Sequence, residues 1–286
     1  MKLPKKFNRF TVIFLLLLPV ATATGEQPRR IVSLAPSITE NLYRLGAEQA
    51  LIAVTSYCNY PPQTKTKEVI GSLSNPNIEK IYSLSPDLVL AINGINPPQT
   101  VEKLKNLGLK VNILNKCHDF DDIKRNFTEL GRIAGKHERA DEIIKEIEIE
   151  INSVTQRMKD RRPVKVFWEI GARPLVTASA KSFANEFIRY AGGINIFANA
   201  PVEYPQISRE DVLNKNPEVI MLVTMGNVTG AEKLRWQKFK DLEAVQNDRI
   251  CIINADKVCR PTPMGFLTGL KAVANFLHPE AFEETE

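Results

Sequence analysis

The sequence predicts an α/β protein of two lobes, each with a central sheet rich in parallel strands, joined by one long rigid helix with a ligand cleft between the lobes. Three observations support this fold class. Short apolar runs alternate with amphipathic segments in both halves of the chain. A charged segment of about seven helical turns separates the halves. The stretch Ile78–Leu90 of the first half also aligns without gaps with Arg209–Met221 of the second.

The N-terminal residues have the pattern of an export signal. Four cations among the first nine residues precede the apolar run Phe10–Val20, and small residues follow at Ala21 and Ala23. This order of charge, apolar run and small residues is typical of a secretory signal peptide. The run is also shorter than the ~20 residues of a membrane-spanning helix. We therefore predict a signal peptide at residues 1–23, and no lipid anchor, because no cysteine lies near that point.

The net charge of +5 comes mostly from this segment. Removing four of the 38 basic residues leaves 34 against 33 acidic residues. A nearly neutral protein offers no electrostatic argument for nucleic acid as a partner. The composition, 43% hydrophobic and 25% charged, excludes collagen-like, disordered and multi-span membrane classes.

The N-terminal lobe is predicted over residues 29–134. Its expected strands are RIVSLAPS with its turn, LIAVTSY, DLVLAI and KVNILN. Its expected helices are ITENLYRLGA, NIEKIYSLSP and TVEKLKNLG, and Gly46 and Gly108 end the first and last of these. Strands that alternate with short helices favour a parallel sheet.

Residues 135–160 are predicted to form the single helix that bridges the lobes. Apolar residues recur every three or four positions between Ala140 and Met158, and neither Gly nor Pro interrupts the segment after Gly135. Pro163 marks the end of the helix.

The C-terminal lobe, over residues 163–286, is predicted to repeat the first pattern. Its expected strands are VKVFWEIG, EVIMLV and RICIINAD, and its expected helices are SFANEFIRYAGG, SREDVLNKNP, KFKDLEAV and FLTGLKAVANFL. In the gapless alignment Glu79 falls on Glu210 and Pro86 on Pro217. The match predicts a duplicated architecture.

No catalytic motif is present, so we predict that the protein is not an enzyme. The sequence lacks GxSxG, HExxH, GxxxxGK[ST] and GxGxxG. A zinc or manganese site would need several converging histidines, whereas His118, His137 and His278 stand in a loop or at helix ends. No metal site is therefore expected.

Four cysteines, Cys58, Cys117, Cys251 and Cys259, would enter an oxidising compartment after export. They allow three full disulfide pairings, and the sequence does not choose among these.

Five segments together resemble the periplasmic substrate-binding proteins of ABC importers for cobalamin and ferric siderophores. They are RIVSLAPSITENLYRLG, TSYCNYPPQ, NIEKIYSLSPDLVLA, VEYPQISREDVL and CRPTP, and the likeness runs from Arg30 to the last helix. The resemblance is strongest to the cobalamin-binding members of this family. It implies a periplasmic monomer with limited hinge motion, a corrinoid as transported ligand, and no cofactor. It also implies a permease and ATPase complex in the inner membrane as partner.

The resemblance also assigns ligand-binding positions. They are Pro36, Ser37, Tyr57, Leu73, Tyr204 and Arg260. Tyr57 matches an aromatic residue that packs on the corrin ring, and Tyr204 matches a tryptophan of the cobalamin-binding members. Aromatic faces suit a ring that is large, flat and mostly apolar. Leu73 replaces a second tryptophan of those members, and Arg260 matches an arginine of the cleft.

Glu79 and Glu210 match the family's permease-docking residues, one glutamate on each lobe. Two such carboxylates would orient the protein on the two halves of a transporter. A carboxylate in the first turn of a helix is also stabilised by the helix dipole, which explains either residue alone but not their symmetric placement.

A haem or ferric-siderophore ligand on the same fold is the alternative. Catecholate siderophores are highly anionic and favour a cluster of cations, for which the sequence offers Arg260 and Arg173. A nearly neutral protein favours a corrinoid. The resemblance also places Cys58 and Cys259 in segments that line the cleft, one on each lobe, and we expect them to face each other across its mouth.

Overall fold

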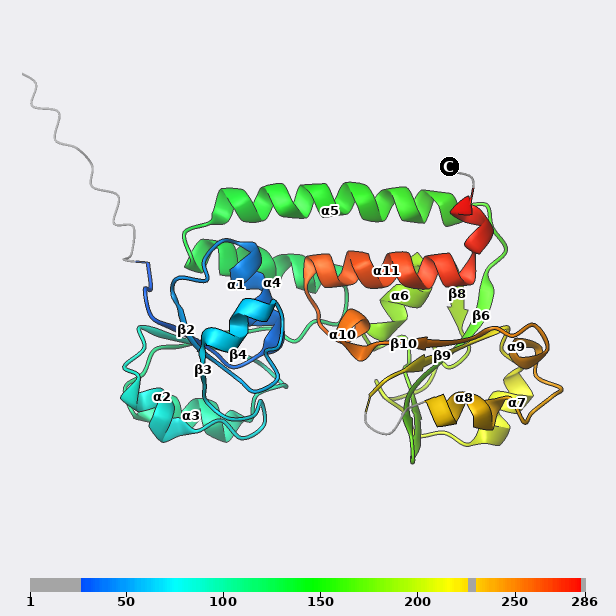
Figure 1. The fold of residues 1–286 in the computed structure, drawn as a ribbon, viewed down its shortest axis with the longest axis horizontal. Helices are drawn as coiled ribbons and strands as arrows, with labels where there is room; N and C mark the ends of the chain where they lie inside the picture. The colour runs from blue at the N-terminus through cyan, green and yellow to red at the C-terminus, as the bar shows by residue number, and fades with distance from the viewer. Residues whose placement is uncertain (1–26, 226–229, 284–286) are drawn as a thin grey trace, which may run out of the picture.

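Two α/β lobes lie next to each other along the long axis of the molecule, and one long helix passes along one side of both (Figure 1). The computed structural model describes residues 27–225 and 230–283. The signal peptide predicted at residues 1–23 falls outside this part of the chain. Within the described ranges no helix is both long enough and apolar enough to cross a membrane.

The N-terminal lobe (N-lobe) is built on a five-stranded parallel sheet with the strand order β3-β2-β1-β4-β5. Its strands are β1 (Ile31–Ser33), β2 (Leu51–Val54), β3 (Glu68–Val69), β4 (Leu88–Ile92) and β5 (Val111–Leu114). Its helices are α1 (Pro36–Arg44), η1 (Pro62–Thr66), α2 (Ile78–Ser83), α3 (Pro98–Asn106) and α4 (Phe120–Ile133). Every residue of β4 is buried because helices cover both faces of the sheet. Leu88 and Leu90 belong to one apolar cluster and Val89 to another.

The C-terminal lobe (C-lobe) is built on a sheet with the strand order β10-β9-β6-β7, and β8 pairs with the first residues of β6. Its strands are β6 (Val164–Ala172), β7 (Leu175–Thr177), β8 (Gly193–Asn195), β9 (Val219–Val223) and β10 (Ile250–Ile253). Its helices are α6 (Ala184–Tyr190), α7 (Arg209–Lys215), α8 (Gly230–Trp236), α9 (Glu243–Gln246), α10 (Ala255–Val258), α11 (Pro263–Leu277) and η2 (Pro279–Ala281). All pairings are parallel except that of β6 with β7.

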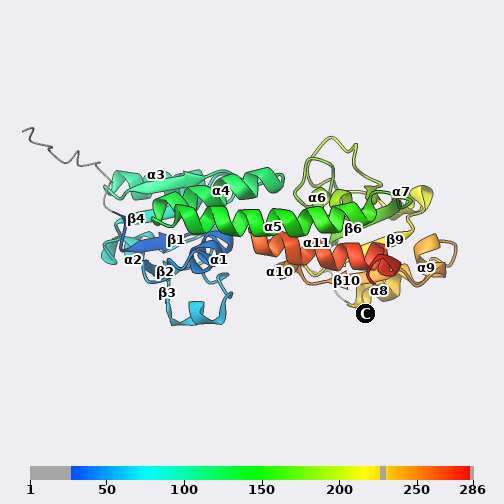
Figure 2. The same cartoon turned by 90° about the horizontal axis from the view of Figure 1, so that it is seen from above.

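The long helix α5 (His137–Met158) joins the lobes, and α11 runs beside it in both views (Figures 1 and 2). Helix α11 packs against α4 of the N-lobe as well as α6 of the C-lobe. The ring of Phe266 on α11 lies 4.9 Å from that of Phe120 on α4 and 5.0 Å from that of Phe187 on α6. One continuous apolar cluster therefore spans both lobes. The sequence predicted only one bridging helix, and the structure adds α11 as a second connection.

The internal sequence match corresponds to equivalent structure. Helices α2 and α7 precede the central strands β4 and β9, which pair in parallel with β1 and β6 respectively. The carboxylate of Asp87 accepts hydrogen bonds from the main-chain amides that lead into β1, at 2.8 and 2.9 Å. The carboxylate of Glu218 accepts one from the Lys165 amide of β6, at 2.8 Å. The two aligned acidic residues thus make the same kind of contact in each lobe.

Candidate functional site: a cleft between the lobes

A cavity of about 580 Å³ lies between the two lobes. The N-lobe contributes the start of α1, the end of β4 and residues 116–117 beyond β5. The C-lobe contributes β6, the start of α6, Tyr204 and residues 258–261. The carboxyl ends of parallel strands are the usual location of ligand sites in α/β sheets. The cavity is therefore the leading candidate for the functional site.

The structure gathers most of the ligand-binding positions that the family resemblance assigned. Pro36, Ser37, Leu73, Tyr204 and Arg260 all line this cavity. Pro36 and Ser37 reach it because α1 begins there, with proline at a position where its missing amide hydrogen costs nothing.

Tyr57 is the assigned position that the structure does not place in the cavity wall. It lies in the loop after β2, and its side chain is 62% exposed. A contact between Tyr57 and a ligand therefore stays a prediction.

Sequence reasoning missed the aromatic residues behind the cleft. Trp168 of β6 and Phe183 line the cavity, and both are almost fully buried. The Trp168 ring stacks on Phe187 at a centroid distance of 6.1 Å, which fixes its orientation. The only signal in the sequence was the tryptophan itself, in the strand segment VKVFWEIG, because large aromatic side chains are common in apolar ligand pockets.

A lysine that the sequence analysis did not single out brings charge into the cleft. Lys116 lines the cavity from the N-lobe, and its Nζ lies 2.5 Å from Oε2 of Glu203 in the C-lobe. The same Nζ lies 6.0 Å from the centre of the Tyr204 ring. Desolvation in the cleft and the adjacent Glu203 carboxylate raise the pKa of the Tyr204 phenol, although 43% of the residue is exposed, so the phenol stays neutral.

Two further polar contacts join the lobes beside the cleft. Arg260 donates to Oδ1 of Asn59 in the N-lobe and forms an ion pair with Asp256 at 2.7 Å. Thr262 donates to Oε1 of Glu40 in the N-lobe at 2.9 Å. Burial raises the pKa of Glu40, against the opposing effect of this hydrogen bond. Arg260 therefore has partners within the protein itself.

All four cysteines are free thiols. Cys259 lines the cleft, whereas Cys58 does not, so the two thiols do not face each other across its mouth as expected. The Cys58 Sγ is buried 3.2 Å from the hydroxyls of Thr39 and Thr55, whereas the Cys259 Sγ lies 3.3 Å from the sulfur of Met225.

The thiol that faces the cleft from the N-lobe is Cys117. Burial raises the pKa of Cys117 to about 12, so this thiol is protonated. Among the residues that the structure describes, no group of three His, Cys, Asp or Glu side chains is placed to hold a metal ion.

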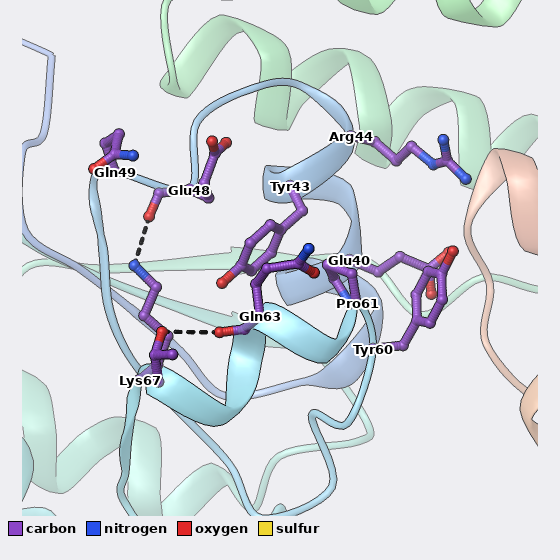
Figure 3. A pocket seen from close by; sticks show the side chains of 10 residues that line it. Glu40, Tyr43, Arg44, Glu48, Gln49, Tyr60, Pro61, Gln63 and Lys67 are labelled. Carbon is purple, nitrogen blue, oxygen red and sulfur yellow. Dashed lines mark hydrogen bonds between the residues drawn. The ribbon is translucent and has the colours of Figure 1, made fainter.

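A second cavity, of about 610 Å³, lies within the N-lobe between α1 and η1 (Figure 3). Its lining is mostly charged or amide-bearing, and the Lys67 ammonium already donates to the main-chain oxygen of Glu48 at 2.8 Å. It contains none of the ligand-binding positions that the resemblance assigned, and it touches only one lobe. The cleft between the lobes is therefore the better candidate.

Comparison with known proteins gives the class to which this fold and cleft belong. Residues 31–257 match the periplasmic binding protein family, and the chain belongs to this family. The family assignment confirms the resemblance found in the sequence and agrees with the prediction that the protein is not an enzyme.

Individual relatives narrow the comparison. A vitamin B12-binding protein of Vibrio cholerae is 34% identical over 87% of this chain and 90% of its own length. The crystal structure of the periplasmic vitamin B12-binding protein BtuF of Vibrio cholerae superimposes with a TM-score of 0.77 and 31% identity, covering 90% of this chain and 99% of that one. A periplasmic heme-binding protein of Roseiflexus superimposes equally well, with a TM-score of 0.77, at 25% identity over 87% of this chain and 97% of that chain.

Proposed function

We propose that the protein is the extracytoplasmic substrate-binding component of an ABC importer and that it captures a corrinoid. The observation that carries the proposal is the cleft lined by Trp168, Phe183 and Tyr204, in a chain 34% identical to a vitamin B12-binding protein. A corrin ring is wide, flat and mostly apolar, so burial against aromatic side chains supplies most of its affinity. A cavity of about 580 Å³ is within the usual size of small-molecule sites, about 300–1,000 Å³.

Capture and release would occur outside the cytoplasm. Residues 1–23 direct export and are removed, and the mature protein acts in the periplasm as a monomer. Residues 29–134 and 163–286 act as the two lobes, joined by residues 135–160. The apolar cluster shared through α5 and α11 supports a limited hinge motion, because close-packed interiors resist sliding.

Glu79 and Glu210 would dock the loaded protein on the permease of an inner-membrane permease and ATPase complex. Each is the second residue of its helix, α2 or α7, and both side chains are exposed. The side chains of Asn77 and Ser208 cap the two helices in the same way. Helices α2 and α7 lie on the side of the molecule away from α5, one on each lobe (Figure 1). This placement supports a two-point contact with a two-part membrane partner.

Calorimetric titration of the purified mature protein tests the ligand. We expect tight, reversible binding of cyanocobalamin and much weaker binding of haemin and of a ferric siderophore. Absence of corrinoid binding would contradict the proposal. Tight haemin binding instead would favour the second candidate, a haem carrier, which the likeness to the Roseiflexus protein supports.

The docking proposal needs a transport assay in vesicles that contain the permease complex. The double substitution Glu79→Ala and Glu210→Ala should abolish stimulated uptake and leave ligand affinity unchanged. Glu146→Ala, on the exposed face of α5, is the matched control and should change neither. Loss of ligand affinity in the double variant would place the two carboxylates in the binding site instead.

A further inference from the structure

The ion pair between Lys116 and Glu203 crosses the cleft from one lobe to the other. It joins Nζ and Oε2 at 2.5 Å, and the two side chains are only 29% and 22% exposed. Lys116 lines the cavity itself. The second oxygen of Glu203, Oε1, is buried and has no hydrogen-bond partner within the described structure. One oxygen of the carboxylate is therefore paired with Lys116, and the other is shielded from water.

The main chain fixes Glu203 in position. Its carbonyl oxygen accepts a hydrogen bond from the Ser179 amide at 3.0 Å, and that of Pro205 accepts one from the Thr177 amide at 3.1 Å. Residues 203–205 are thus bonded along the end of β7, and Tyr204 between them lines the cleft. The main chain that carries the Glu203 carboxylate is therefore anchored to β7.

The second cation of the cleft has a different kind of counter-ion. Lys116 and Arg260 are the cations among the described residues that line the cavity. Arg260 pairs with Asp256, whose side chain is 57% exposed. Solvent screens an exposed carboxylate and weakens its field, whereas the Glu203 side chain is only 22% exposed and is screened less. Of the two carboxylates that pair with the cleft cations, Glu203 therefore has the stronger electrostatic effect on an incoming ligand.

We propose that Glu203 sets the charge preference of the cleft. By holding Lys116 in an ion pair, it removes the positive charge that an anionic ligand, such as a haem with two propionates, needs. An anion near Lys116 would have to separate the pair and leave a largely shielded carboxylate without a partner, which is costly. A neutral or cationic corrinoid pays no such cost. This inference rests on the proposed function and names the ligand charge that the same site selects.

The test compares three ligands of different charge on purified variants. The probes are haemin, which is anionic, cyanocobalamin, which is neutral, and aquocyanocobinamide, which is cationic. Glu203→Gln frees Lys116 and should raise the ratio of haemin affinity to cobinamide affinity at least tenfold, with less gain at high salt. Lys116→Met leaves Glu203 alone and should move the ratio in the opposite direction. Cyanocobalamin affinity should change less than threefold in Glu203→Gln.

Two controls keep the result interpretable. Asp256→Asn also removes a counter-ion from a cleft cation, but an exposed one, and should shift the ratio less than Glu203→Gln. Glu146→Gln on α5 should shift nothing. An unchanged ratio in Glu203→Gln, or shifts in the same direction for Glu203→Gln and Lys116→Met, would overturn the proposal. If the native protein bound no corrinoid, the proposed function would fail. A tenfold gain in haemin affinity of Glu203→Gln would still support the charge preference, and no gain would refute it.

Discussion

Glu169 is a buried carboxylic acid whose ionisation should make the protein less stable as the pH rises. It follows Trp168 in β6, on the face of the strand away from the cleft, and its side chain is fully buried. Its Oε2 accepts a hydrogen bond from the Trp236 indole at 2.6 Å, and its Oε1 has no partner. The nearest charges are Glu232 and the two arginines that pair with it, Arg209 and Arg235.

Burial raises the pKa of Glu169 from 4.5 to about 7, with the charge of Glu232 acting in the same direction and the Trp236 hydrogen bond against it. Between these two pH values the folded protein keeps a proton that the unfolded chain has lost. The free energy of unfolding must therefore fall as the pH rises through this window. Each pKa unit corresponds to about 1.4 kcal/mol. The fall in the free energy of unfolding therefore totals about 3 kcal/mol and is complete above pH 7.

Glu169→Gln isolates this contribution because glutamine is neutral at every pH and its amide oxygen can still accept from Trp236. Urea unfolding, followed by the fluorescence of the two buried tryptophans, gives the free energy of unfolding at pH 5, 6, 7 and 8. The free energy of unfolding of the variant, relative to that of the native protein, should rise by about 2–3 kcal/mol between pH 5 and pH 8. The exposed substitution Glu146→Gln is the control and should show no such trend. A constant difference between Glu169→Gln and the native protein across this range would refute the reasoning.

Three further predictions concern the cleft, the packing of α11 and the thiols. Tyr204→Ala should weaken corrinoid binding about tenfold to a hundredfold in calorimetry, because it removes an aromatic face from the cleft, whereas Tyr82→Ala on α2 should not. Gly269→Ala should cost about 1–3 kcal/mol and lower the melting temperature, because a Cβ would lie 2.6 Å from the Phe187 ring and 2.7 Å from a main-chain oxygen. Gly230→Ala, where a Cβ meets open space, is its control. A thiol assay in urea without reductant should count four free cysteines, and a reducing agent should leave the melting temperature unchanged.

The fold was predictable where apolar residues recur in the sequence with the clear spacing of a strand or a helix. DLVLAI becomes β4, buried on both faces, and residues 135–160 contain α5 with its apolar stripe on one side. Helix α4 was missed although its signals are present, since Asp119 caps it and its buried residues recur at helical spacing. KFKDLEAV was expected to be one helix, but only Glu243–Gln246 is helical. The Phe239 amide there bonds back to Trp236 and forms a turn at the end of α8 instead.

The candidate site was predictable only as far as single segments resemble the family. The resemblance assigned the start of α1 and the CRPTP segment to the cleft, and residues of both line it. The Lys116–Glu203 pair joins residues 87 positions apart on different lobes. No local pattern marks either residue, because their contact depends on how α5 and α11 set the lobes relative to each other.

The duplicated architecture of the lobes explains why Glu79 and Glu210 take equivalent positions, without reference to the cleft. Asp87 and Glu218 each bind the main chain at the start of the neighbouring strand, so their positions are fixed by the sheet in both lobes. Glu79 and Glu210 stand eight positions before these residues in both halves, which places them alike on α2 and α7. The neighbouring position differs, because Ile78 is apolar whereas Arg209 reaches the buried Glu232 at 2.5 Å. An alignment of the halves can therefore place paired carboxylates, whereas contacts such as that of Arg209 arise from packing within one lobe and must be read from the structure.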